Sequence, residues 1–209
     1  MDQKTEFIIN NLNNMYPDAH CELNHETPFQ LLIAVVLSAQ TTDERVNKVT
    51  PSLFAKYGDC YSLANAPLKD VELLIHSIGL YHNKAINIIA LANALVKDFN
   101  GEVPRTRKAL MSLPGVGRKT ANVVLSVVYD IPSFAVDTHV SRIAKRLGLA
   151  KYNDDVLKIE EKLCRKIPRV YWNKSHHQFI FFGRYFCKAV NPNCKSCPFT
   201  DICKKIKYE

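Results

Sequence analysis

The sequence predicts an all-α protein. Apolar residues recur at helical spacing along almost the whole chain, strand-like alternation of apolar and polar residues is not found, and glycine and proline fall where helix ends are expected. These observations predict roughly ten helices. With 209 residues, 47% of them hydrophobic, the chain can bury a real core in one large domain or two small lobes.

The first strongly apolar segment is residues 28–40, PFQLLIAVVLSAQ. It is apolar on almost all sides, so we expect a central helix surrounded by other helices. Thr42 followed by Asp43 is a candidate N-cap for the next helix. Pro51 and Pro67 are candidates for the first turns of helices, where the missing N–H of proline costs nothing.

Further helices are expected along the rest of the chain. Helical spacing of apolar residues is found at Val71, Leu74, Ile75 and Ile78, at Ile86, Ile89, Leu91, Leu95 and Val96, and at Val156, Ile159, Leu163 and Ile167. Candidate residues just beyond helix C-termini are Gly58, Gly79, Gly101 and Gly148. From Gly183 onward the chain is rich in cysteine and lysine, and we expect its end to be a loop organised by a metal.

Positive charge is concentrated in the second half of the chain. Residues 1–100 carry 7 Lys and Arg against 11 Asp and Glu, a net charge of −4, whereas residues 101–209 carry 21 against 9, a net charge of +12. Such asymmetry favours a polyanionic partner, either nucleic acid or an acidic membrane surface. A solvated basic face is the plainer alternative.

A membrane-spanning or secreted protein is not expected. The longest apolar stretches, residues 31–37 and 88–92, are much shorter than the roughly 20 residues of a membrane span. The first residues, MDQKTE, lack the basic region and apolar run of a signal peptide. We therefore expect a cytoplasmic protein.

Four of the seven cysteines are crowded near the end of the chain, at Cys187, Cys194, Cys197 and Cys203. An odd number of cysteines with this clustering does not resemble a secreted disulfide framework, so the cluster predicts a metal site. Four thiolates suit either zinc or an iron–sulfur cluster. Zinc ribbons usually pair two C-x2-C knuckles, and only one is present here, which leans away from zinc without excluding it.

Two of only seven glycines lie in one pentapeptide, Leu113-Pro114-Gly115-Val116-Gly117, between the helical segments 105–112 and 118–128. A tight Gly-x-Gly turn that opens a helix presents unpaired N–H groups and the positive end of the helix dipole, which together can bind a phosphate. The alternative is an ordinary corner between two helices.

Lys119 lies in the first turn of the helix that follows this pentapeptide. The helix dipole and the neighbouring Arg118 both disfavour the charged form of its amine, so Lys119 could act as a nucleophile. The alternative is a simple phosphate contact. Asp137, before Thr138-His139-Val140, could likewise be only an N-cap.

Five motifs in order resemble one family. They are LLIAVVLSAQTTD at 31–43, IGLYHNKA at 78–85, LPGVGRKTA at 113–121, VDTHVSRIAKRLGL at 136–149 and the four terminal cysteines. The stretch LPGVGRKTANVVL matches the helix-hairpin-helix element of DNA repair proteins, and the whole set resembles the endonuclease III family of DNA glycosylases over nearly the full length.

The resemblance implies two helical lobes with DNA bound across the cleft between them. The first lobe would comprise residues 21–131, with the hairpin at about 113–118. The second would combine residues 1–20 with 132–209, including a [4Fe-4S] cluster loop at 187–203 held by the four cysteines. Periodicity alone does not predict that discontinuity.

The resemblance also implies an activity in base excision repair. The family's bifunctional members carry their Schiff-base lysine at the position of Lys119, and an aspartate at the position of Asp137 that caps its helix and stabilises the sugar cation. We therefore expect a bifunctional DNA glycosylase and AP lyase that removes oxidised pyrimidines. Its partner would be duplex DNA with damaged pyrimidines or abasic sites, bound by a monomer in the cytoplasm at the nucleoid, with no membrane involved.

Several residues are implied as DNA contacts. The hairpin would hold phosphates through Gly115, Val116, Gly117 and Arg118. Gln40, Ile78 and Leu80 would fill and open the duplex where the damaged nucleotide has left, although sequence alone favours core positions for Ile78 and Leu80. Lys204 and Lys205, next to the cluster loop, would reach the DNA backbone.

Two alternatives remain open on the sequence. A monofunctional relative that excises mispaired adenine would share the hairpin, aspartate and cluster, but such relatives generally lack the lysine and carry a further C-terminal domain, whereas this chain ends six residues after Cys203. A DNA-binding module without activity would also use a helix-hairpin-helix element, and Lys119 together with Asp137 argues against it.

Overall fold

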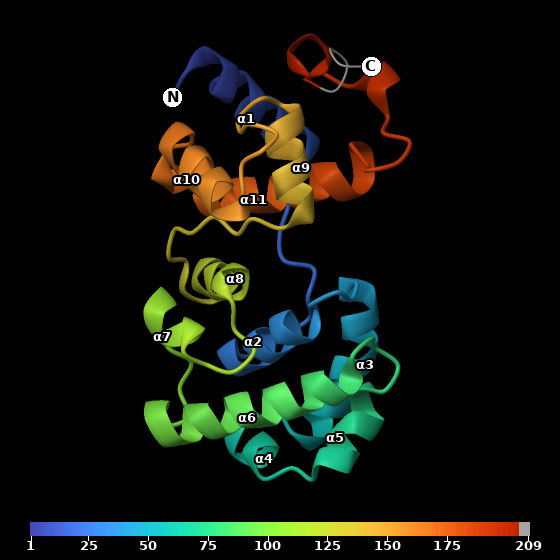
Figure 1. Ribbon diagram of the computed structural model, residues 1–209, viewed down its shortest axis with the longest axis vertical. Helices are drawn as coiled ribbons and strands as arrows, with labels where there is room; N and C mark the ends of the chain where they lie inside the picture. The colour runs from blue at the N-terminus through green and yellow to red at the C-terminus, as the bar shows by residue number, and fades with distance from the viewer. Residues whose placement is uncertain (205–209) are drawn as a thin grey trace. The chain divides into compact units, whose positions relative to one another are not determined.

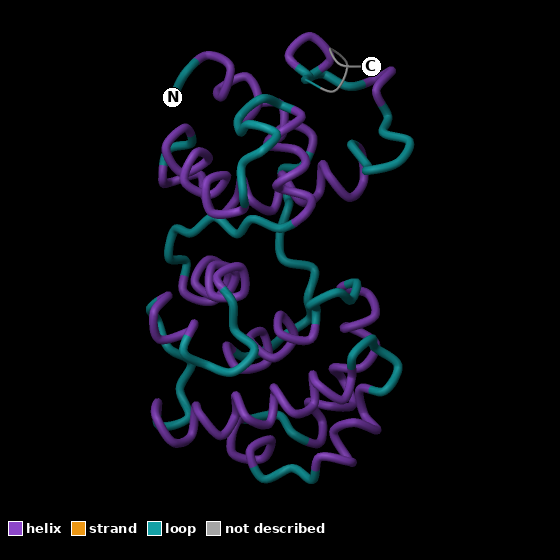
Figure 2. The backbone as a smooth tube through the Cα atoms, in the orientation of Figure 1, coloured by secondary structure: helices purple, strands orange, loops and turns teal. Residues whose placement is uncertain are grey.

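A computed structural model describes residues 1–204 of the chain, and all regular secondary structure in that range is helical (Figures 1 and 2). The prediction of an all-α protein is confirmed. The described residues form eleven α-helices, somewhat more than the expected ten, together with short 3-10 and π turns. None of these helices is long and apolar enough to cross a membrane.

The chain divides into two compact units, one of which is discontinuous in sequence. Unit 2 is residues 22–129, and unit 1 combines residues 1–21 with residues 130–204 of the described chain. The helices of unit 2 are α2 (Pro28–Leu37), α3 (Asp43–Lys56), α4 (Cys60–Ala64), α5 (Leu68–Ile75), α6 (Tyr81–Phe99), α7 (Arg107–Met111) and α8 (Arg118–Tyr129).

Helix α2 is the central element of unit 2, as its sequence predicts. Every residue from Phe29 to Leu37 is buried, and the helix packs against α3, α6 and α8. Its start is well defined because Thr27 caps it, accepting a hydrogen bond from the Gln30 N–H at 3.2 Å, and Pro28 occupies the first position. A helix buried on all sides fixes the positions of the three helices around it.

Unit 1 is built on α1 (Gln3–Met15), α9 (Thr138–Arg146), α10 (Val156–Lys166) and α11 (Trp172–Phe181). Helix α9 packs against both α10 and α11, and α11 packs against α1 (Figure 1). Helix α11 continues into a π-helical turn, Phe182–Phe186, and two short 3-10 turns follow, Cys194–Ser196 and Thr200–Ile202. The core is apolar and includes Ile8, Leu12, Phe134, Ile143, Leu163 and Phe179.

Some expected helix ends are wrong. Pro51 does not start a helix but lies inside α3, on its exposed face. Because proline has no N–H, the carbonyl of Asn47, four residues earlier, loses its helical hydrogen bond and can bind water instead. Pro67 is the N-cap of α5, one residue before its first turn. Gly58, Gly101 and Gly148 each directly follow the C-cap residue of a helix, as predicted, and the last two have φ of +81° and +67°. Gly79 is misplaced, because α5 already has its C-cap at His76.

Candidate functional site

The hairpin joins α7 to α8 through residues 112–117. Its two glycines differ in why a side chain is absent there. Gly115 has φ of +75°, and a Cβ atom there would lie 3.3 Å from Val36 Cγ1 of α2 and 3.4 Å from Asn87 Cβ of α6. Gly117 has no positive φ, and a Cβ atom there would have no neighbour within 4 Å. The fold therefore requires glycine at position 115. At position 117 the fold has room for a side chain, and glycine leaves the backbone there uncovered.

The middle of the hairpin is anchored by apolar side chains. Leu113 and Val116 are buried, whereas Gly115 and Gly117 are exposed. The side chain of Val116 is thus committed to packing, and only its backbone lies near the surface. Helix α8 starts directly after Gly117, whose carbonyl accepts the first helical hydrogen bond, from the Ala121 N–H at 2.9 Å. The N–H groups of the first turn of α8 have no partners within the helix, as at any helix start.

Lys119 is the second residue of α8 and is exposed. The residues that α8 buries begin two positions later, at Ala121, so the amine of Lys119 projects from a helix whose other face is held in the core. A hydrogen bond of 2.8 Å from Arg107 Nε to Asn122 Oδ1 ties α7 to α8 across the hairpin. The element that carries the amine is therefore rigid and open to a reacting partner.

Two further expected residues of unit 2, Gln40 and Leu80, adopt left-handed backbone conformations. Their φ values are +54° and +60°, which is uncommon for residues other than glycine and occurs often at functional sites. The core position that sequence favours for Leu80 is wrong, because 58% of this residue is exposed. Ile78 is 2% exposed, so its side chain packs inside unit 2.

Lys84 connects these two turns, and the sequence analysis missed it. Its Nζ donates a hydrogen bond of 2.6 Å to Thr41 Oγ1, next to Gln40, and its backbone N–H bonds to the carbonyl of Leu80 at 3.0 Å. Burial lowers the pKa of the Lys84 ammonium. A signal was present, because Lys84 stands four and seven residues before the buried Ile88 and Leu91, on the apolar stripe of α6.

Asp137 lies in unit 1 and is the N-cap of α9. Its Oδ1 accepts a hydrogen bond of 2.7 Å from the Val140 N–H. Within residues 1–204, Oδ2 receives no hydrogen bond, so the second oxygen of this half-buried carboxylate is left for another group. The capping role considered from sequence is confirmed, and it does not use the whole carboxylate.

The four clustered cysteines line one cavity in unit 1. Cys187, Cys194, Cys197 and Cys203 surround it together with Arg146, and none of them forms a disulfide. Within residues 1–204, no three His, Cys, Asp or Glu side chains lie close enough together to hold a single metal ion. The four thiols therefore share one space in unit 1.

Two arginines of α9 bind the segment that carries these cysteines. Arg146 Nη1 donates to Cys187 Sγ at 3.1 Å and to the Lys188 carbonyl at 2.8 Å, and Arg142 Nη2 donates to the Gly183 carbonyl at 2.7 Å. The sequence analysis missed both, although their spacing of four residues puts them on one face of α9. Lys204 is exposed, and its N–H bonds to the Arg146 carbonyl at 2.6 Å, whereas Lys205 lies outside the described residues.

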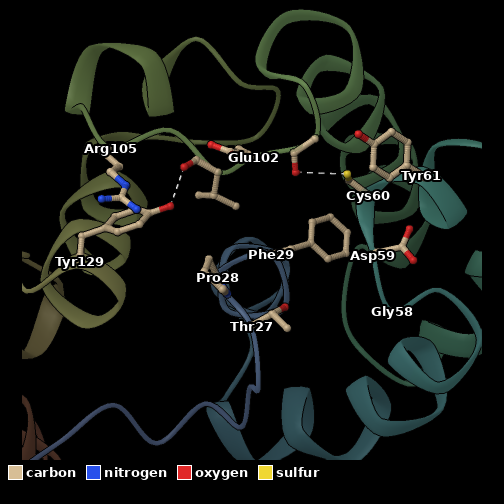
Figure 3. Close-up of a pocket in the computed structure, with 12 residues that line it drawn as sticks. Thr27, Pro28, Phe29, Gly58, Asp59, Cys60, Tyr61, Glu102, Arg105 and Tyr129 are labelled. Atoms are coloured by element: carbon tan, nitrogen blue, oxygen red, sulfur yellow. Dashed lines mark hydrogen bonds between the residues drawn. The ribbon is translucent and has the colours of Figure 1, made fainter.

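Unit 2 also contains a cavity of about 380 Å³ that none of the expected site residues lines (Figure 3). Asp59 and Glu102 lie on its wall together with Arg105, whose guanidinium lies 5.0 Å from the centre of the Tyr129 ring. The Tyr129 hydroxyl donates to the Val103 carbonyl at 2.5 Å. The contacts of Arg105 and Tyr129 are therefore made within unit 2. Because the wall carries both acidic and basic side chains, its charge favours neither an anionic nor a cationic ligand.

Comparison with known proteins gives the class of this chain. Residues 33–169 match the family described as "HhH-GPD superfamily base excision DNA repair protein". Since the match covers more than half of the chain, the protein belongs to this superfamily. Within it, the chain belongs with the endonuclease III enzymes, a group of DNA glycosylases and AP lyases, on the similarities that follow.

The relatives are similar over nearly their whole length. Endonuclease III of Bacillus subtilis (strain 168) is 50% identical over 203 residues, covering 97% of this chain and 93% of that protein. Endonuclease III of Escherichia coli (strain K12) is 44% identical over 197 residues, covering 94% and 93%. A solved structure titled as a trapped endonuclease III–DNA covalent intermediate matches with a TM-score of 0.95 and 53% identity, covering 100% of this chain and 99% of that one.

We predict different effects for alanine at the two hairpin glycines. Gly115→Ala should lower the free energy of unfolding by about 1–2 kcal/mol, because a non-glycine residue pays that penalty in the left-handed region. Gly117→Ala should lower it by no more than about 0.5 kcal/mol, as for other surface substitutions. Denaturant unfolding of both variants measures the difference, and equal losses would contradict the separate roles.

Proposed function

We propose that this base excision repair glycosylase is bifunctional. It removes oxidised pyrimidines from duplex DNA and then cleaves the strand 3′ to the abasic site by β-elimination, with Lys119 as the nucleophile. The observation that carries the proposal is the exposed amine of Lys119 in the first turn of α8, directly after the hairpin. A relative with 53% identity is described as a trapped covalent intermediate with DNA, which supports a covalent step for this chain.

The reaction needs one amine for both bond cleavages. Lys119 Nζ, in its unprotonated form, attacks C1′; the C1′–N bond breaks and its electron pair leaves with the base, which takes up a proton. One proton then passes from the nitrogen to O4′ as the C1′–O4′ bond breaks and the sugar ring opens. The nitrogen lone pair forms the C1′=N double bond of the protonated Schiff base. Loss of a proton from C2′ then expels the 3′ oxygen, and water hydrolyses the imine to release Lys119.

Asp137 is proposed to act by charge. Positive charge develops on the sugar as the glycosidic bond breaks, and a fixed carboxylate lowers the energy of that state. The cap bond from Oδ1 to the Val140 N–H holds the carboxylate in place, and Oδ2 is left to face the reacting sugar or to carry a proton. The capping bond and the electrostatic role are therefore compatible in one side chain.

The DNA contacts are proposed on the same residues as the sequence suggested, with one adjustment. The backbone of Gly115, Val116, Gly117 and Arg118 would hold a phosphate at the start of α8. Gln40 and the exposed Leu80 would enter the duplex, with Lys84 as the residue that positions their turns. Because the Ile78 side chain is buried, it would support the turn that carries Leu80 and would not itself enter the duplex.

The four clustered cysteines are proposed to hold a [4Fe-4S] cluster. Their free thiols line one cavity, and four thiolates are the ligand set of a [4Fe-4S] cluster. When bound, the cluster would tie the segment from Cys187 to Cys203 to α9, where Arg146 already donates to Cys187 Sγ. Its loop would then present Lys204 in a defined position.

We expect Lys119→Gln to lower strand cleavage of an abasic duplex by about 10³-fold or more, the scale on which nucleophile removal acts in covalent enzymes. Binding to the same duplex should be retained, because the substitution keeps a polar side chain of similar length. Lys108→Gln, the same change at an exposed lysine of α7, is the matched control and should cleave at the parent rate. The assay compares nicking on abasic and oxidised-pyrimidine duplexes.

Two outcomes would overturn the proposal. Strand cleavage by Lys119→Gln at the parent rate would move the nucleophile to another amine. Base release by the parent protein with no cleavage of abasic DNA would make the protein monofunctional.

The protein purified under reducing, oxygen-free conditions should contain about four iron and four sulfide ions per chain and absorb broadly in the visible region. Cys194→Ser should lose most of the iron, because it removes one of four ligands. Cys164→Ser, at a half-buried cysteine outside the cavity, should keep it. One zinc per chain in an active, colourless protein would contradict the cluster.

A further inference from the structure

A strongly basic cavity lies in unit 1, apart from both the cysteine cavity and Asp137. Its volume is about 610 Å³. Ten residues line it, six of them are cationic and none is acidic: Lys145, Gly148, Leu149, Ala150, Lys151, Tyr152, Lys162, Arg165, Lys166 and Lys204. We call it the basic basin. Apart from Lys204, none of these residues has a part in the proposed reaction.

The fold brings the basin together from segments far apart in sequence. Helix α9 ends at Arg146 with Leu147 as its C-cap, and the next residue, Gly148, has φ of +67°. The Leu149 N–H then donates to the Ala144 carbonyl at 2.8 Å. A Cβ atom at Gly148 would lie 2.7 Å from Lys4 Nζ and 3.2 Å from Lys204 Cε. The glycine therefore both ends the helix and leaves room for lysines from the two ends of the described chain.

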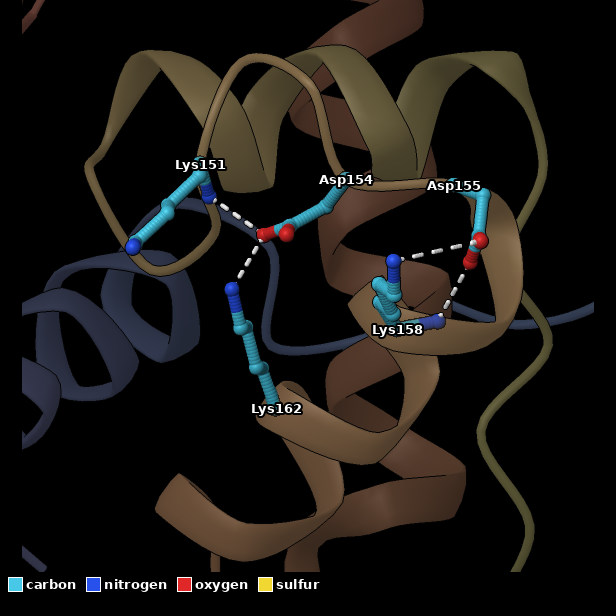
Figure 4. A network of polar contacts seen from close by, with 5 residues as sticks. All are labelled: Lys151, Asp154, Asp155, Lys158 and Lys162. Carbon is cyan, nitrogen blue, oxygen red and sulfur yellow. Dashed lines mark hydrogen bonds and ion pairs between the residues drawn. The ribbon is translucent and has the colours of Figure 1, made fainter.

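Most of the basin's charge is not neutralised by nearby carboxylates. Asp154 accepts from Lys162 Nζ at 2.5 Å and from the Lys151 backbone N–H at 2.6 Å (Figure 4), and Asp2 lies 3.5 Å from Lys166 Nζ. The other four cations of the basin, Lys145, Lys151, Arg165 and Lys204, form no ion pair within residues 1–204. Four cations without a carboxylate partner around one cavity raise the local concentration of anions there.

Helix dipoles explain only part of this set. Lys145 lies in the last turn of α9, and Arg165 and Lys166 lie in the last turn of α10, where cations are favourable by about 0.3–1 kcal/mol each. Lys151 and Lys204 belong to neither helix, and Lys162 precedes the last turn of α10. The favourable interaction with a helix dipole therefore does not account for the other three cations of the basin.

We propose that the basic basin binds the phosphodiester backbone of a second stretch of nucleic acid. Tyr152, 87% exposed, stands on its rim with Lys145 Nζ 6.0 Å from the ring centre, and a tyrosine hydroxyl can donate a hydrogen bond to a phosphate oxygen. Cations spread over separate segments suit a row of phosphates better than one compact anion.

The basin is a separate contact from the one at Asp137. Asp137 caps the N-terminus of α9, whereas the basin lies at its C-terminal end, from Lys145 onward; the nine residues of α9 span about 14 Å. The chain leaves the cysteine cavity at Cys203 and enters the basin at Lys204, so the loop next to the cavity ends on this second surface. An enzyme with such a basin could hold one DNA segment for repair while it contacts another.

The test uses the full-length protein as purified. It is first saturated with a short unlabelled duplex that carries an uncleavable abasic-site analogue, and a fluorescent undamaged duplex is then titrated at several salt concentrations. The parent protein should bind the second duplex one to one. Lys151→Ala combined with Arg165→Ala should make the log–log salt slope of this second binding shallower by about 1.8, from about 0.9 per phosphate contact. Strand cleavage of damaged duplex should stay at the parent rate.

The matched control removes the same charge elsewhere. Lys69→Ala combined with Lys158→Ala changes two exposed lysines that do not line the basin, and Lys158 lies on α10 itself, paired with Asp155 (Figure 4). This variant should keep the parent slope. Two outcomes would overturn the proposal directly: the parent binds no second duplex, or both double variants change the salt slope equally. A third would assign the basin to a free polyphosphate: inorganic tripolyphosphate displaces the second duplex at a phosphate concentration below that of the duplex itself.

Discussion

Helix α9 is the element on which the arrangement of unit 1 depends, because nearly every functional group of this unit is fixed by a bond to it. Its N-terminus is capped by Asp137, which holds that carboxylate in one position. Arg142 and Arg146, one turn apart, hold the Gly183 carbonyl and the Cys187 sulfur. Its C-terminal glycine, Gly148, leaves the space into which Lys4 and Lys204 extend. A nine-residue helix thus organises a carboxylate, a cysteine cavity and a basic basin.

In unit 2 the equivalent constraint is the burial of α2. The hairpin turn lies on it, since a Cβ atom at Gly115 would press on Val36, and the start of α8 follows from that turn. The exposed amine of Lys119 is therefore held by packing on the opposite face of its own helix rather than by bonds of its own. Lys84, buried in α6, plays a similar part for the turns that carry Gln40 and Leu80.

Periodicity and breaker residues predicted the helical class and a central helix in residues 28–40, because a fully apolar helix is buried; the helix itself ends at Leu37. The conformation of Leu80 could not be predicted, since a left-handed turn at a leucine is imposed by its tertiary setting and runs against local preference. Pro51 likewise lies inside a helix that its surroundings stabilise. The basic basin was hidden because Lys145, Lys151, Lys162 and Lys204 meet only in three dimensions.

The central claim is that the amine of Lys119 becomes covalently bonded to the sugar. The most direct measurement reduces the reaction with borohydride on a duplex containing one oxidised pyrimidine, digests the trapped complex and maps the sugar-modified peptide by mass spectrometry. We predict a single modified peptide, from the start of α8, with the added mass on Lys119. A modification on any other amine would contradict the account, including one on Lys84, whose pKa is lowered by burial. Base release without any trapped complex would contradict it as well.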